Sequence, residues 1–119
     1  MEILRIREEQ IWAFEQEEEK AYRRSFAALL PGVWPELCAK LGPDGVQGWV
    51  DLGFQRAREH RIHKRENLTR YVHLMFMLGD KDFDRNPALD WAATLLGWGG
   101  KEGLKLAALE KRARDQGDA

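Results

Sequence analysis

YVHLMFMLGDKDFDRNPALDW, Tyr71 to Trp91, is the stretch of this 119-residue sequence that decides the fold. It begins with the most apolar run of the chain, which ends at Gly79, a residue suited to closing a helix. After an Asp-rich loop, Pro87 is typical of the first turn of a new helix. We therefore predict a central apolar helix over about residues 65–78, followed by a loop and a further helix.

The loop between these two helices has two readings. Its polar side chains alternate like the first ligands of an EF-hand calcium loop: Asp80, Asp82, Asp84 and Asn86. The sixth and twelfth positions, where that loop needs Gly and Glu, hold Arg85 and Trp91, so we expect no metal there. Instead, we expect Phe83 to anchor the loop in the core, Asp84 or Asn86 to cap the helix that starts at Pro87, and Trp91 to face inward.

Helical spacing of apolar residues extends over the rest of the chain. It predicts an all-α fold, a compact array of about six helices near residues 7–30, 33–41, 44–60, 65–78, 87–96 and 101–116. We expect a single domain, 1–119, in which the thin apolar face of the last helix, 101–116, makes that helix peripheral. The first helix has a polar middle, so one end is expected to project or to meet a partner. Gly48 and Gly53 suggest that another helix crosses the third one closely.

Composition limits the classes of function. The net charge of −1 gives no overall attraction to nucleic acid or to an anionic membrane. Cys38 is the only cysteine, which excludes an internal disulfide and is typical of a reducing cytoplasm. The acidic N-terminal sequence does not resemble a signal peptide, and no apolar run is long enough for a membrane span. We expect a cytoplasmic protein.

Charged and aromatic residues supply the candidate binding surface. A basic segment contains Arg56, Arg58, Arg61, Lys64 and Arg65, and the first helix carries acids that include Glu15, Glu18 and Glu19. The basic segment has three readings: solvated cations at a helix end, a protein-binding face, or a less favoured nucleic-acid contact. The acids match it within the molecule or on a second copy, which leaves a homo-oligomer open. Trp12 and Trp98 stand at positions that are less typical of a core, and they are candidate contact residues.

No catalytic constellation is visible in the sequence. His60 and His63 are spaced poorly for a metal without a third ligand, and His73 lies within an apolar helix. Ser25, the only serine, has no partner base nearby in the sequence. We therefore expect no enzyme activity and no cofactor.

Three segments carry a resemblance to a known family: LRIREEQ at the start, GFQRAREHRI from Gly53, and YVHLMFMLGDKDFDRNPALDWAATLL from Tyr71. They resemble the pattern LxIxxxQ, GxxxAxxxGI and LMxxLGxxFDxDPxxxWAxxIL of small helical bacterial proteins. That family is similar to accessory products of type VI secretion clusters, near spike (VgrG) and effector-adaptor genes. This sequence departs from the pattern at Arg61, where the pattern has Gly, and at Asn86, where it has Asp.

The resemblance implies a binding role without catalytic residues. Its expected form is a co-chaperone or adaptor partner in effector loading, and the expected partner is an effector, an adaptor or a spike component. The alternatives are an immunity protein that neutralises a toxin and, less favoured, a nucleic-acid binder using the Arg56–Arg65 segment.

Overall fold

The protein folds into consecutive helices joined by short connections. The computed structural model describes the backbone of residues 2–117 and the side chains of residues 16–116. In sequence order the elements are α1 (Glu2–Leu29), the 3-10 turn η1 (Leu30–Gly32), α2 (Pro35–Glu59), α3 (Arg65–Leu78), η2 (Phe83–Arg85), η3 (Pro87–Leu89), α4 (Asp90–Leu96) and α5 (Glu102–Gly117). Residues 2–117 contain no strand, so the predicted all-α class is confirmed.

Element α2 joins the second and third predicted helices. Its helical backbone is interrupted at Gly42, where φ is 73° and ψ is 166°. A positive φ of this size suits glycine, and Pro43 then fits the first turn of the new helical segment. The structure therefore has five numbered α-helices in place of about six, with the predicted boundary between the second and third preserved as a kink.

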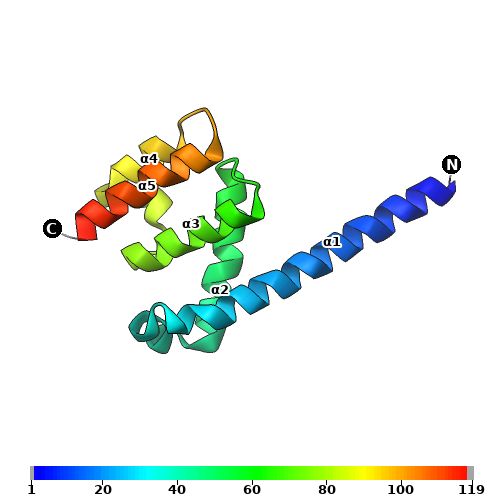
Figure 1. Cartoon of the computed structure of the whole chain (residues 1–119), viewed down its shortest axis with the longest axis horizontal. Helices are drawn as coiled ribbons and strands as arrows, with labels where there is room; N and C mark the ends of the chain where they lie inside the picture. Colours follow the sequence, from blue (N-terminus) through cyan, green and yellow to red (C-terminus); the bar gives the residue numbers. More distant parts are fainter. Residues whose placement is uncertain (1, 118–119) are drawn as a thin grey trace.

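The predicted central helix is confirmed as α3. It is apolar on several sides, and its buried apolar side chains are Leu68, Tyr71, Val72, Leu74, Met75 and Phe76. Both α2 and α5 pack against it (Figure 1). Because burying one such side chain contributes roughly 1.5–3 kcal/mol, α3 supplies the largest share of the core.

The two glycines expected at a close helix crossing behave differently. A Cβ atom on Gly53 would lie 2.7 Å from the Met75 sulfur and 2.7 Å from a Val72 methyl carbon. Gly53 thus allows α2 to approach α3 closely, as predicted. Gly48 has nothing within 4 Å of the same position, so the prediction is wrong for that residue.

The loop after α3 is anchored by one of its own side chains, which is buried in the core. Gly79 ends the helix in a left-handed conformation, with φ of 66°. Phe83 is fully buried, and its ring centroid lies 5.0 Å from that of Tyr71, which confirms the expected anchor. Of the two expected caps, Asn86 is the one that acts: its Oδ1 accepts the Ala88 N–H at 2.9 Å, and Pro87 opens a 3-10 turn that leads into α4.

The last helix, α5, is more deeply packed than its sequence indicated. Leu106 and Leu109 are fully buried and Ala113 nearly so, against α3 and α4. The sequence therefore underestimated the burial of α5, one face of which packs into the core. The apolar face of α5 is narrow, but these three side chains at helical spacing are enough to pack the helix against its neighbours.

The first helix extends away from the other four. Figure 1 shows its N-terminal part running past the rest of the molecule, while its C-terminal end lies against α2. The helix begins at Glu2, five positions before the predicted start at residue 7. The Cα radius of gyration is 16.2 Å, larger than the roughly 13.5 Å of a compact protein of this length. Among the described residues, no helix has both the length and the apolarity needed to cross a bilayer.

Candidate functional site

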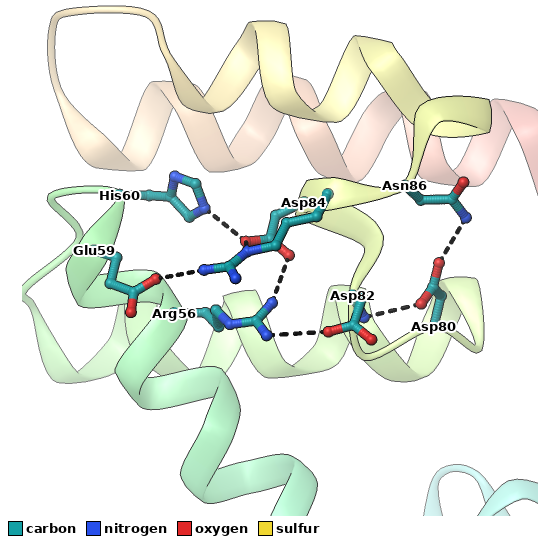
Figure 2. A network of polar contacts seen from close by, with 8 residues as sticks. Arg56, Glu59, His60, Asp80, Asp82, Asp84 and Asn86 are labelled. Carbon is teal, nitrogen blue, oxygen red and sulfur yellow. Dashed lines mark hydrogen bonds and ion pairs between the residues drawn. The ribbon is translucent and has the colours of Figure 1, made fainter.

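The basic segment at the end of α2 does not form one continuous surface. Arg56, its first member, is only 13% exposed and donates to Asp84 at 3.0 Å and to Asp82 at 3.1 Å (Figure 2). Burial lowers the pKa of the guanidinium, but the two carboxylates outweigh this effect and the pKa is raised. Arg56 therefore holds the loop after α3 against α2, and its positive charge is paired with these two carboxylates.

Asp84 is the centre of this network. Its side chain is fully buried, with Oδ1 accepting from Arg56 and Oδ2 lying 2.9 Å from Nε2 of His60. Arg85 lies 3.6 Å from the same carboxylate and pairs with Glu59 at 3.0 Å. Figure 2 shows these side chains converging between the end of α2 and the loop. The fully buried carboxylate is thus compensated by three cationic or polar neighbours.

The remaining loop carboxylate, that of Asp80, accepts its hydrogen bonds from within the loop. Asp80 accepts the Asp82 N–H at 2.9 Å through one oxygen and the Asn86 side-chain amide at 2.8 Å through the other. The alternating aspartates thus contact different partners, in keeping with a mechanical role for the loop. Tyr71 packs beneath them, and its fully buried hydroxyl has no well-formed hydrogen bond among the described residues. Burial and the neighbouring Asp84 raise the pKa of that phenol.

The acids of α1 pair with other members of the basic segment within the molecule. Glu19 lies 2.6 Å from Arg58, and Glu18 lies 3.8 Å from Arg65. Arg65 also stacks on Tyr22, with its guanidinium carbon 4.8 Å from the ring centroid. These pairs are half exposed, so each contributes at most about 1 kcal/mol. The acidic and basic segments thus meet inside one molecule, one of the two arrangements that we expected.

Arg61, Lys64 and Trp98 are exposed and take part in none of the ion pairs among the described residues. Arg61 has a positive φ of 65°, a conformation that costs any residue other than glycine about 1–2 kcal/mol. Trp98 is 54% exposed in the turn between α4 and α5. The side chains of Trp12 and Glu15 lie outside the described residues. Trp91 is half-buried and packs against the core, as expected. Its indole N–H donates to Gln116 at 3.1 Å.

Arg61 and Trp98 meet at one polar pocket of about 400 Å³, which we call the Trp98 pocket. Its walls come from the end of α2, the glycine-rich turn 97–100 and the first turn of α5. His60 lines it, and so does Lys105, which is only 7% exposed. The Lys105 ammonium donates to the Leu96 carbonyl at 2.9 Å and so satisfies the C-terminal end of α4.

An apolar groove of about 440 Å³ lies at the other end of α2, between its first turns, η1 and the C-terminal end of α1. Its only polar lining side chains are Arg24 and Gln47, apart from the thiol of Cys38. The rest of its lining is small or rigid: Ala27, Ala28, Pro31, Pro35, Ala39, Pro43 and Val46. Three of the four prolines of the sequence thus shape one surface.

Sequence reasoning found neither Lys105 nor this groove. Lys105 stands in a charged helix, where a lysine is expected to be solvated. Its spacing of four and eight residues from Leu109 and Ala113, both buried, was the signal that it shares their inward face. The groove had no local signal, because it is assembled from two helices and a turn.

The histidines form no cluster that indicates catalysis. His73 packs edge-on against Phe26 and lies 5.0 Å from Trp34, measured between ring centroids. Burial lowers its pKa, and Glu110 offsets only part of this effect. His73 therefore lies at the boundary of the core.

Three comparisons, with protein-family models, with curated proteins and with solved structures, found no match for this protein.

Proposed function

We propose that this protein is a non-enzymatic module that binds another protein, and that it acts as a co-chaperone or adaptor partner in type VI effector loading. The binding role is supported by the apolar groove. The secretion role is supported by the sequence resemblance and is the finer part of the proposal. Effector loading would place the protein in the cytoplasm.

The apolar groove is the observation that carries the binding role. Small side chains such as Ala28 and Ala39 allow another backbone to approach closely, and the prolines hold the walls rigid before binding. Leu29 and Val33 are 69% and 57% exposed and lie within two residues of groove residues in the sequence. Exposed apolar side chains of this kind are typical of interaction sites.

The occupant that fits this shape is an amphipathic helix of the partner. A helix lays one apolar face into such a groove and keeps its polar margins in water. Arg24 and Gln47 stand among the lining residues as the only polar side chains apart from the thiol, so an acidic residue beside the apolar face of the helix would complement Arg24.

The intramolecular ion pairs support this reading over the nucleic-acid alternative. Arg56, Arg58 and Arg65 are each paired with acids of the same molecule. A phosphate backbone would have to compete with those carboxylates, which reduces the affinity available from this segment.

The test is a binary binding measurement by calorimetry. The purified protein is titrated, one at a time, with a type VI spike protein, an adaptor and an effector of the same organism. We expect one of them to bind, and Ala39→Arg to raise Kd at least about tenfold by filling the groove. Ala107→Arg, an exposed position on α5 outside the groove, is the matched control and should leave Kd unchanged.

Three outcomes would contradict the proposal. If none of the three proteins binds, the loading role is wrong. If Ala39→Arg binds as well as the control, the groove is not the site. If a toxic effector alone binds and the protein rescues intoxicated cells, immunity replaces loading as the function.

A further inference from the structure

The Trp98 pocket contains a buried cation without a buried anion. Among residues 16–116, no carboxylate lies within 4 Å of the Lys105 ammonium. Its one hydrogen bond, to the Leu96 carbonyl, uses one of three N–H donors. A buried ammonium is normally compensated by a carboxylate or by several acceptors.

Arg61 adds a second, strained cation to the same pocket. With φ of 65°, its backbone adopts a conformation that glycine would adopt without strain. The conformation closes the C-terminal end of α2, since the Arg61 N–H donates to the Arg58 carbonyl and the Ile62 N–H to the Ala57 carbonyl, each at 3.0 Å. The guanidinium is exposed and has no carboxylate partner among the described residues.

Trp98 and the glycines around it form the accessible side. Exposed tryptophans are enriched at the centres of protein interfaces. The backbone N–H groups of Gly99 and Gly100 have no acceptor within the described part of the sequence, and backbone N–H groups in turns bind carboxylates well.

We propose that the Trp98 pocket binds an acidic side chain, Asp or Glu, of a protein partner. Lys105 supplies the buried cation, Arg61 the exposed one, and Trp98 covers the bound group. A protein carboxylate is favoured over a nucleic acid because nucleic-acid binding needs a continuous basic surface, and Arg56, Arg58 and Arg65 are already paired with acids of the same molecule. This site is separate from the apolar groove and does not depend on it.

The experiment follows amide and indole N–H signals of the 15N-labelled protein by NMR. The probe is an acetylated, amidated pentapeptide with one Glu and one Asp between alanines, and the matched neutral peptide carries Gln and Asn. We expect saturable shifts at Gly97–Gly100 and at the Trp98 indole with the acidic peptide only. Lys105→Met should weaken binding at least about tenfold, and Lys111→Met, an exposed lysine of the same helix, should not.

Arg61→Gly gives a second variant that does not depend on Lys105. It should weaken binding of the acidic peptide while raising the melting temperature, because it removes a cation and the backbone strain together. The absence of saturable shifts at millimolar acidic peptide would overturn the proposal, as would equal shifts with the neutral peptide. Stronger binding of inorganic phosphate or a single-stranded oligonucleotide would assign the pocket to a different class of ligand and would also overturn it.

Discussion

Asp84 is a residue whose replacement should cost substantial stability. Its carboxylate is fully buried and holds Arg56 and His60, so Asp84→Asn removes the anion that compensates a nearly buried guanidinium. Breaking such a pair on one side costs about 3 kcal/mol of unfolding free energy. Urea denaturation should show this loss, and Asp115→Asn, an exposed acid on α5, should change stability by less than about 0.5 kcal/mol. A loss below about 1 kcal/mol at Asp84 would contradict the role given to it.

Removal of the Tyr71 hydroxyl should, by contrast, raise the stability of the protein. Its hydroxyl is buried without a well-formed hydrogen bond, although the ring itself packs against Phe83. Tyr71→Phe keeps the ring and removes the unsatisfied group, so the unfolding free energy should rise by about 1 kcal/mol. Tyr22→Phe, at the half-buried tyrosine, is the comparison and is expected to be near neutral. A clear fall in stability for Tyr71→Phe would mean that the hydroxyl is bonded to Asp84.

Single residues also show where sequence reasoning succeeded. The anchor at Phe83 was predictable because one large apolar residue stands in a polar loop. The partners of Arg56 were not, because they lie 26 and 28 residues further along the sequence and only the packed loop brings them near. Arg61 occupies the position where the resembled pattern has Gly, and its positive φ gives that glycine a physical reason.

At the scale of elements, the crossing of α2 over α3 can be tested with two glycines of one helix. Gly53→Ala would place a Cβ atom 2.7 Å from side-chain atoms of Met75 and Val72 and should cost about 2 kcal/mol. Gly48→Ala meets no atom within 4 Å and should stabilise by up to about 1 kcal/mol through helix propensity. Thermal melts of the two variants should therefore shift in opposite directions. Equal shifts would show that the crossing is looser than described.

The start of α5 is attached to the start of α3 by Glu102. Its carboxylate accepts the backbone N–H groups of His63 and Lys64 at 3.1 and 2.8 Å and the Asn67 amide at 2.8 Å. Desolvation raises the pKa of Glu102, but these hydrogen bonds outweigh it and the pKa is lowered from 4.5. The stability that they contribute is therefore present above about pH 4.5 and is lost as pH falls through the lower pKa of the folded state.

Glu102→Gln should remove part of that acid sensitivity. At neutral pH the variant should lose roughly 1–2 kcal/mol, because its neutral amide accepts these hydrogen bonds more weakly. Below about pH 4 the difference from the wild-type protein should shrink. Denaturation curves between about pH 7 and about pH 3 measure both effects, and a constant difference across this range would exclude the linkage.

The helices themselves were largely predictable, because helical periodicity and the glycine and proline stops are local signals. The depth of α5 was not, since its buried face has few large apolar residues. Lys105 occupies one inward position on that face, so counting apolar residues underestimated the burial. Lys105 also lines the Trp98 pocket, of which the sequence had indicated only Arg61 and Trp98.

On the scale of the whole molecule, the first helix accounts for the elongated shape. The molecule measures 59 × 35 × 20 Å, and every buried core residue that the structure describes lies between Ala27 and Ala113. A fragment of residues 16–119 should therefore keep the midpoint of urea unfolding of the full-length protein. By small-angle X-ray scattering, its radius of gyration should fall toward about 13 Å, the value of a compact protein of its length. A lower midpoint would show that residues before 16 contribute to the core.

The two candidate binding regions stand at opposite ends of α2. The groove lining on α2 extends to Gln47 and the Trp98 pocket begins at Glu59, so about 12 residues, or about 18 Å of helix, separate them. That separation exceeds the Debye length of about 8 Å at physiological salt. Substitutions in one region should therefore leave ligand affinity at the other unchanged, and a large partner could contact both.

The single cysteine gives the molecule a built-in chemical reporter. Cys38 is the only thiol in the sequence, is 6% exposed, and lies in the lining of the apolar groove. Burial raises the pKa of its thiol, so little thiolate is present at neutral pH and alkylation should be slow. Thiol alkylation of the unmodified protein can therefore occur only at Cys38, in the lining of the groove. Mass spectrometry of the alkylation rate follows occupancy of that surface directly, without an engineered label.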